Sequence, residues 1–195
     1  MLAVAPNVLG ARLASKSRLM TLVMVFGFAG LTAVAAQWRI ALPFTPVPIT
    51  GQTFAVLLAG AALGVRAGAA SQMLYLLLGM VGLPVFAEGG SGLDTFAGAT
   101  GGYLVGFVAA AAMVGKLAER HQDRAFPNAL TAFLVGSFVI YAFGVSGLVF
   151  NAGMSVNEAI LKGVAPFVFG DVLKAVAAGL LLPATWRLMG EGRRS

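Results

Sequence analysis

The sequence predicts an all-α integral membrane protein built as a bundle of six transmembrane helices. Of its 195 residues, 59% are hydrophobic and only 10% are charged, whereas about a quarter of the residues are charged in a typical soluble domain. So few charges cannot cover a protein surface in water, which makes lipid the natural solvent. Because one spanning helix needs roughly 20 mostly apolar residues, the length allows about six spans with short loops. We therefore expect residues 1–195 to form one membrane domain.

Six long apolar segments are separated by polar, proline-rich or glycine-rich stretches. They cover residues 19–37, 49–64, 67–83, 98–117, 129–150 and 164–189. The first resembles a signal peptide, because Arg12, Lys16 and Arg18 precede it and small residues end it. Its apolar run exceeds the usual signal core of about 7–15 residues, and the rest of the chain also needs a membrane. We therefore expect a retained first helix, with 1–18 as a cytoplasmic segment, 19–189 as the bundle and 190–195 as a cytoplasmic tail.

The distribution of Lys and Arg predicts that both termini are cytoplasmic. In that orientation only Arg39 and Lys162 of the 13 basic residues lie outside, and Lys174 falls within the last helix. The remaining ten are Arg12, Lys16, Arg18, Arg66, Lys116, Arg120, Arg124, Arg187, Arg193 and Arg194. An even number of helices satisfies the positive-inside rule at every loop, whereas five or seven helices would place a basic terminus outside.

Two connections on the predicted outer side are long. Residues 41–48 contain Pro43, Pro46 and Pro48 and cannot form a regular helix, because proline lacks the N–H donor and keeps its neighbour extended. The segment 49–64 begins among these prolines, so it could be tilted or re-entrant. Residues 84–96 are rich in glycine and predict a flexible loop. Long loops of this kind are often lids or binding loops.

Asp171 and Lys174 are the most informative residues, because both lie several positions inside the last apolar segment. Their spacing of three places them on one face of a helix. An ionisable side chain at membrane depth costs about 3 kcal/mol or more and is retained mainly where it faces protein or a water-filled cavity. One hypothesis is a ligand site with an acceptor and a charged donor. The other is a mutually neutralising pair that packs the bundle.

Other polar and small residues give weaker signals. Gln52, beside the proline-rich connection, is a candidate amide partner for a polar ligand. Tyr75, Tyr103 and Tyr141 are more typical of interface anchors or packed residues than of ligand contacts. Glycines and alanines four residues apart usually mark contacts within a bundle; they include Gly60 with Gly64, and Gly102 with Gly106. Ala29 and Ala33 on the first helix could instead form a stripe that docks a partner membrane protein.

The sequence lacks the residues that several classes of function require. Gly115-Lys116 is followed by Leu117 and lacks the upstream glycine of a P-loop, so ATP binding through that motif is excluded. One His and no Cys make a metal site implausible. The only His lies near charged residues at an inner loop and cannot complete a hydrolase triad. The basic residues are scattered at segment ends rather than gathered on one face, which argues against nucleic acid as a partner.

Five sequence blocks, taken in order, resemble BioY proteins, the substrate-binding (S) components of energy-coupling factor (ECF) transporters for biotin. The blocks are LTAVAAQ at 31–37, LPFTPVPITGQT at 42–53, GMVGLPVFA at 79–87, TGGYLVGF at 100–107 and GDVLK at 170–174. The resemblance extends from the first predicted helix to the last.

The resemblance implies a multi-pass protein of a prokaryotic plasma (inner) membrane that binds biotin with high affinity near its outer face. It implies that Gln52, Tyr103, Asp171 and Lys174 form the pocket and that the loop after the first helix is a lid. It further implies docking of Ala29 and Ala33 on a transmembrane coupling subunit, with ATP hydrolysis in two separate ATPase subunits. No cofactor or metal is implied.

Two alternatives remain open. The chain could be a self-sufficient carrier that moves biotin or another small vitamin without ATPase partners. A membrane enzyme would need a catalytic constellation, and the sequence offers only Asp171 and Lys174 for one.

Overall fold

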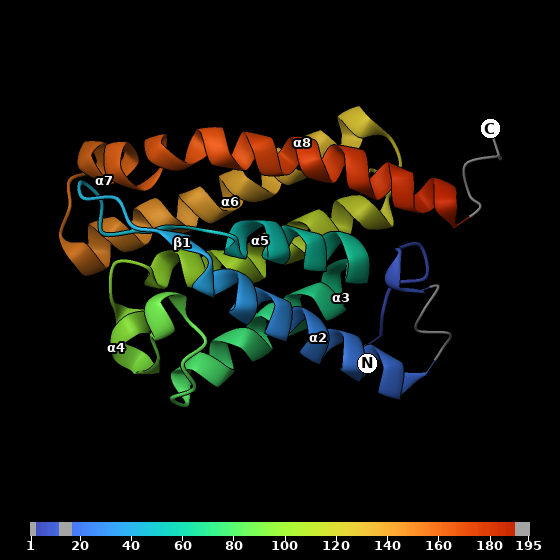
Figure 1. Ribbon diagram of the computed structural model, residues 1–195, viewed down its shortest axis with the longest axis horizontal. Helices are drawn as coiled ribbons and strands as arrows, with labels where there is room; N and C mark the ends of the chain where they lie inside the picture. Colours follow the sequence, from blue (N-terminus) through green and yellow to red (C-terminus); the bar gives the residue numbers. More distant parts are fainter. Residues whose placement is uncertain (1–2, 12–16, 190–195) are drawn as a thin grey trace.

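Five long helices make up most of the part of the chain that the structure describes. The computed structural model describes residues 3–11 and 17–189, and its long helices form an elongated bundle (Figure 1). The helices are α2 (Arg18–Gln37), α3 (Gln52–Met80), α5 (Gly101–Glu119), α6 (Phe126–Ala152) and α8 (Ala165–Leu188). Each is long and apolar enough to cross a membrane, so the chain is a multi-pass, helical membrane protein.

Helix α3 folds back on itself at Gly64, where φ is 79° and ψ is −174°. Gln52 Nε2 lies 2.7 Å from the Tyr75 hydroxyl, although a straight helix would separate these residues by roughly 35 Å. The two halves, 52–63 and 65–80, therefore run antiparallel. The sequence predicted separate helices at 49–64 and 67–83, and the structure joins them through a single glycine.

Small residues allow the helices of the bundle to approach closely. A Cβ on Gly60 would overlap the carbonyl group of Ala111 on α5. Between α5 and α6, a Cβ on Gly147 would lie 2.6 Å from the Cα of Gly102. Gly106 also faces α6, against Ile140. These contacts confirm the predicted packing role for Gly60, Gly102 and Gly106, whereas Gly64 forms the turn of the α3 hairpin.

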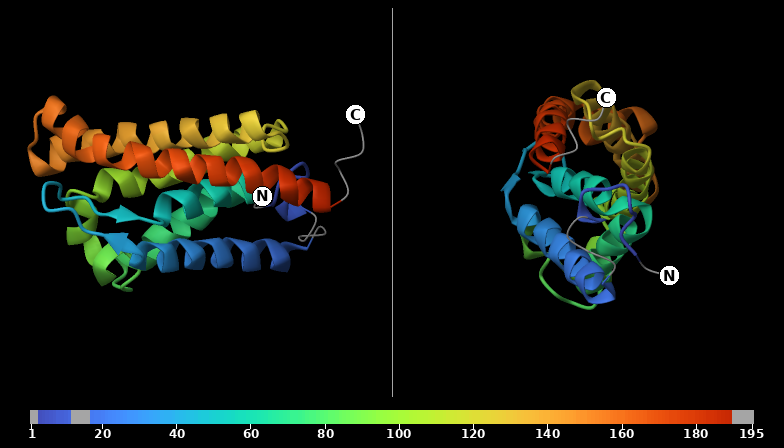
Figure 2. Two further views of the ribbon diagram at one scale, coloured as in Figure 1. Left: turned by 45° about the horizontal axis from the view of Figure 1, so that its top comes forward. Right: turned by 90° about the vertical axis from the view of Figure 1, so that its right-hand side faces the viewer.

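The short elements gather at one end of the bundle (Figures 1 and 2). Strands β1 (Arg39–Ile40) and β2 (Ile49–Thr50) pair antiparallel, and between them the proline-rich residues 41–48 are irregular, as predicted. The loop predicted at 84–96 has secondary structure of its own, because it contains η1 (Ala87–Gly89) and most of α4 (Gly92–Ala97). A further short helix, α7 (Val156–Gly163), begins where the Ser155 side chain accepts a hydrogen bond from Glu158 N.

Residues 3–11 and the C-terminal end of α8 lie at the opposite end (Figure 2). The first of these segments packs on the tip of the α3 hairpin, where Ala5 N donates to Leu63 O and Val8 is fully buried. Arg39 and Lys162 lie at the end with the short elements, where they form ion pairs with Glu88 and Glu158. Of the basic residues predicted to be inside, Arg12, Lys16, Arg193 and Arg194 fall outside the described residues, as do 190–195 of the predicted tail.

Asp123, in the connection between α5 and α6, fastens this end to α8. It is 1% exposed, and its Oδ2 accepts a hydrogen bond of 2.6 Å from Trp186 Nε1. The guanidinium of Arg124 lies 4.3 Å from the centre of the Trp186 ring. Burial raises the pKa of the Asp123 carboxyl above its usual value, although the Trp186 hydrogen bond and the charges of Arg124 and His121 act in the opposite direction.

Substitution of Gly64 by alanine should destabilise the protein. The backbone conformation at this position is essentially restricted to glycine and costs another residue about 1–3 kcal/mol. A Cβ there would also lie 2.6 Å from Glu119 Oε1 and 2.8 Å from the Ala5 Cβ. Thermal unfolding in detergent measures the effect. Gly30→Ala is the matched control, because a Cβ on Gly30 meets nothing within 4 Å. Equal stability of the two variants would contradict the role of Gly64.

Asp123→Asn and Asp123→Ala should differ in stability at neutral pH. A raised pKa means that the folded state binds the proton more tightly, so the contribution of this group to stability falls as pH rises through the folded pKa. Asn removes the buried charge and keeps an acceptor for Trp186, so this variant should be at least as stable as wild type. Ala leaves the indole N–H unpaired, which costs about 1–3 kcal/mol. Equal destabilisation of both variants in thermal unfolding would refute this account.

Candidate functional site

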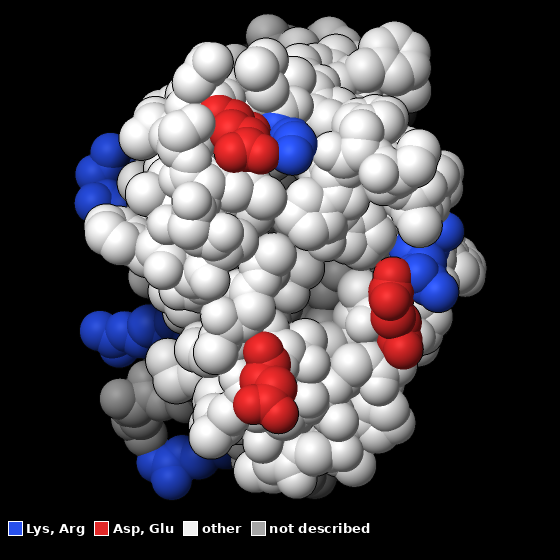
Figure 3. Space-filling model, turned by 90° about the vertical axis from the view of Figure 1, so that its left-hand side faces the viewer, with Lys and Arg blue, Asp and Glu red and all other residues white. Residues whose placement is uncertain are grey.

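A cavity of about 420 Å³ lies at the end of the bundle that carries the short elements. Its volume falls within the range of roughly 300–1,000 Å³ that is usual for small-molecule sites. Figure 3 views this end, where the surface is hollowed between scattered acidic and basic groups. The wall comes from both long connections and from α3, α5, α6 and α8. Its larger apolar side chains are Phe86, Leu104, Phe107, Ile140 and Phe167.

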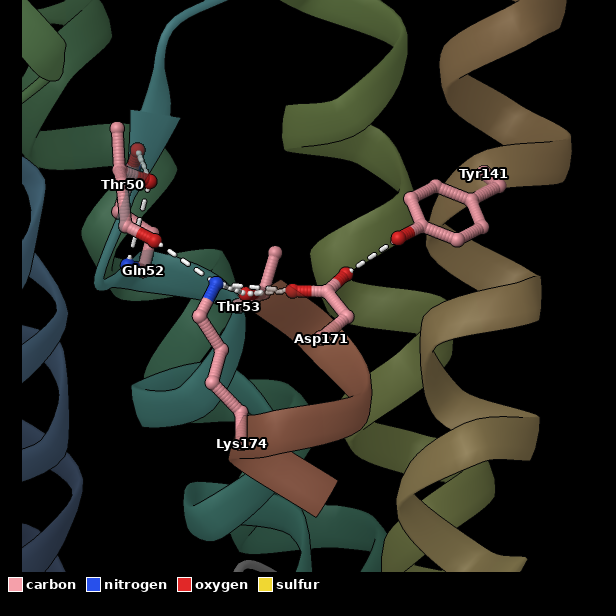
Figure 4. A network of polar contacts seen from close by, with 6 residues as sticks. All are labelled: Thr50, Gln52, Thr53, Tyr141, Asp171 and Lys174. Carbon is pink, nitrogen blue, oxygen red and sulfur yellow. Dashed lines mark hydrogen bonds and ion pairs between the residues drawn. The ribbon is translucent and has the colours of Figure 1, made fainter. Parts of the chain in front are cut away.

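Lys174 contributes an ammonium group whose donors are all engaged. Lys174 lies on α8, and its side chain is 23% exposed. Lys174 Nζ donates to Asp171 Oδ1 at 2.8 Å, to Thr53 Oγ1 at 2.7 Å and to Thr50 O at 3.0 Å (Figure 4). A lysine ammonium has three N–H donors. In this arrangement none of the three is left for a ligand.

Asp171 accepts hydrogen bonds from three different helices. Its side chain is 6% exposed, and Oδ1 accepts from Lys174 on α8 and from Thr53 on α3, the latter at 3.1 Å. Oδ2 accepts from the Tyr141 hydroxyl on α6 at 2.6 Å (Figure 4). Because an ionised carboxylate accepts about four hydrogen bonds, two on each oxygen, capacity for one more remains on Oδ2. The charged pair is therefore both a tie between helices and part of the cavity wall.

Gln52 lines the cavity from the first residue of α3 and is 5% exposed. Its Oε1 accepts from the Thr50 hydroxyl at 3.0 Å, and its Nε2 donates to the Tyr75 hydroxyl at 2.7 Å. Tyr75 in turn donates to Val85 O at 3.1 Å. Gln52 thus ties the two halves of α3 to the connection that follows, and one amide hydrogen remains for another partner.

Tyr103 lines the cavity from α5, and its hydroxyl is bonded to α7. The hydroxyl donates to Gly163 O, the last residue of α7, at 2.7 Å. The neighbouring carbonyl of α7, Lys162 O, accepts from the Thr45 hydroxyl at 2.7 Å. The proline-rich connection and Tyr103 are therefore fastened to the same end of α7, beside the cavity.

The structure brings the four predicted pocket residues, Gln52, Tyr103, Asp171 and Lys174, to one cavity. Thr50, Thr53 and Tyr141 also line the cavity, although the sequence did not predict them as pocket residues. Thr50 and Thr53 flank Gln52 in the 42–53 block, and that proximity was an available signal. Tyr141 was considered only as one of three tyrosines with a more typical anchoring role.

The predicted docking residues lie away from the cavity, on α2. Ala29 is 1% exposed and belongs to the buried core of the bundle, and Ala33 is half-buried against the same core. The exposed positions of α2 include Gly27 and Gly30, where a Cβ would meet nothing within 4 Å. No three His, Asp or Glu side chains gather as a metal site requires in residues 3–11 and 17–189.

The family model described as BioY matches residues 10–191. The chain belongs to the BioY family. Among its relatives, "Biotin transporter BioY" of Rhizobium etli is 42% identical over 168 residues, which cover 82% of this chain and 89% of the relative. The protein of the same name from Thermotoga maritima is 41% identical over 154 residues, covering 79% and 88%.

One solved structure has a closely similar fold. It is described as the S-component for biotin from an ECF-type ABC transporter, and it superimposes with a TM-score of 0.78. The match covers 91% of this chain and 94% of the other, with 24% sequence identity. At this level of identity the comparison establishes the shared fold.

Thr53→Val should weaken the charged network without changing the shape of the site. The threonine hydroxyl accepts from Lys174 and donates to Asp171. Its loss leaves both charged groups short of one hydrogen bond, which costs about 1–3 kcal/mol of stability. Thr53→Ser is the control, because it keeps the hydroxyl. Thermal unfolding without ligand should show Thr53→Val clearly below Thr53→Ser, and the reverse order would be evidence against the network.

Proposed function

We propose that this protein is the high-affinity biotin-binding subunit of a vitamin uptake transporter. The observation that carries the proposal is the Asp171–Lys174 pair in the wall of a cavity of about 420 Å³. Membership of the BioY family and the names of relatives from Rhizobium etli and Thermotoga maritima support biotin as the ligand. The role is binding and transport rather than catalysis, as family membership and the names of these relatives indicate.

The chemistry of the cavity suits the parts of biotin. Biotin has a cyclic urea with two N–H donors and a carbonyl, an apolar thiophane ring, and a carboxylate on a flexible tail. Asp171 Oδ2 offers an acceptor for a urea N–H, and Gln52 offers one amide hydrogen for a carbonyl. The aromatic and aliphatic side chains of the wall suit the ring and the tail. Polar groups of a ligand can be buried without loss only where such partners exist.

The proposed topology has six crossings with both termini in the cytoplasm of a prokaryote, in the plasma (inner) membrane. In this topology each of the two antiparallel halves of α3 crosses the membrane once, so α3 accounts for two of the six crossings. Arg66, Arg120, Arg124 and Arg187 then face the cytoplasm, in line with the positive-inside rule. The cavity would face the outside, where biotin arrives.

We propose that a transmembrane coupling subunit and two ATPase subunits energise transport, because the chain has no P-loop of its own. Helix α2 is the proposed docking element. With Ala29 inside the bundle, contact through α2 would involve Ala33 and the exposed positions near Gly27 and Gly30. The alternative is a carrier that works without ATPase partners. Uptake of labelled biotin by cells that produce this chain but no ECF-type ATPase would favour that alternative, and absence of uptake would favour the coupled transporter.

Purified protein in detergent should bind biotin tightly, and Asp171→Asn should weaken binding at least tenfold. A hydrogen bond to a charged group contributes about 1.5–3 kcal/mol, which corresponds to about 10- to 100-fold in affinity. Lys174→Ala should weaken binding as well, because it leaves Asp171 without its counter-ion. Equilibrium binding of labelled biotin measures the affinities, and circular dichroism checks the fold.

The matched control is Lys162→Met, which breaks the exposed ion pair with Glu158 on α7 and keeps the backbone carbonyl that Thr45 uses. Its affinity for biotin should equal that of wild type. Absence of binding to the wild-type protein would exclude the proposed ligand. Unchanged binding by both site variants would leave the charged pair with a structural role alone.

A further inference from the structure

Tyr141 places a hydroxyl group in the cavity wall at the one oxygen of Asp171 that has spare capacity. It comes from α6 and donates to Asp171 Oδ2 at 2.6 Å. Figure 4 shows Asp171 between Tyr141 on one side and Lys174 with Thr53 on the other. Both Tyr141 and Asp171 line the cavity.

The two oxygens of Asp171 have different surroundings. Oδ1 accepts from Lys174 and Thr53, so both of its lone pairs are engaged. Among the described residues, Tyr141 provides the only donor to Oδ2. Since Oδ1 is saturated, a ligand N–H that reaches this carboxylate must bond to Oδ2, beside the Tyr141 hydroxyl.

The Tyr141 bond also determines the direction in which that remaining lone pair faces. Lys174 and Thr53 hold only one oxygen of the carboxylate, and the terminal torsion of an Asp side chain has a broad energy profile. A second fixed point on Oδ2, contributed from a different helix, removes this rotational freedom. An acceptor held in place before the ligand arrives loses less entropy on binding.

We propose that Tyr141 is a positioning residue for ligand recognition, which fixes Asp171 Oδ2 to accept an N–H donor of the ligand. The proposal rests on the proposed function, in which the donor belongs to the cyclic urea of biotin. Tyr141 acts through Asp171, so its contribution depends on the presence of that carboxylate and of the ligand N–H.

The first test is a double-mutant cycle with labelled biotin. Tyr141→Phe keeps the ring and removes the hydroxyl. It should lower the affinity by up to about 10- to 100-fold, the value of the ligand's own hydrogen bond to the charged Asp171, because the acceptor Oδ2 is no longer held in place. In the Asp171→Asn background the same change should have a much smaller effect, because the group it positions has been altered. Ser146→Ala is the control, since it removes an exposed hydroxyl of α6 whose hydrogen bond, to Ala142 O, lies within the same helix.

The second test separates positioning from a general loosening of the pocket. Biotin and its two analogues with a methyl group on either urea nitrogen are compared as competitors of labelled biotin. For the analogue that lacks the hydrogen given to Asp171, Tyr141→Phe should leave the affinity unchanged, while the affinity for biotin falls. A structural defect would lower the affinity for every ligand by the same factor.

The outcomes distinguish this inference from the function on which it rests. If the wild-type protein does not bind biotin, the proposed function fails. If wild type binds but Tyr141→Phe binds equally well, or its effect adds in full to that of Asp171→Asn, the positioning role is overturned and the function stands. The same conclusion follows if Tyr141→Phe lowers the affinity for biotin and for both analogues equally.

Discussion

The Asp171–Lys174 pair is the constraint on which the arrangement of this end of the bundle depends. Charged side chains at membrane depth are stable only when other groups replace the water that they lose. Lys174 obtains three acceptors, and Asp171 obtains donors from α3, α6 and α8. These bonds require Thr53 and Tyr141 to lie within reach of α8. The cavity wall is therefore built by the groups that make the charged pair tolerable.

The site also depends on the hairpin at Gly64, because this turn brings the two ends of α3 close together. Gln52 begins the helix and Tyr75 lies near its end, yet the two side chains are hydrogen-bonded. The second half of the hairpin begins at Val65, whose N–H is bonded to the Glu119 carboxylate at 2.8 Å. A carboxylate at a helix N-terminus is stabilising, so α5 holds the turn from one side. A turn of one residue leaves little freedom in the relative position of the two halves.

The sequence was sufficient for the features that depend on local composition. Apolar length predicted the long helices. Two charges inside an apolar segment drew attention to Asp171 and Lys174, which the structure places in the cavity wall. The Ser155-x-x-Glu158 spacing is typical of a helix N-terminus, yet α7 was not predicted because the segment around it is short. The direct turn at Gly64 could not be predicted either, since a glycine within an apolar run is equally compatible with packing.

The sequence was less informative about which face of each helix points into the bundle. In a lipid-exposed bundle both the outer and the inner face of a helix are apolar, so the pattern of α2 did not reveal that Ala29 faces the core. The same ambiguity concealed Tyr141, because a tyrosine in an apolar helix can face lipid, neighbouring helices or a cavity. Only the position of α6 relative to α8 decides between these. Tyr141 and Asp171 are 30 residues apart in the chain, and their contact is a property of the tertiary structure.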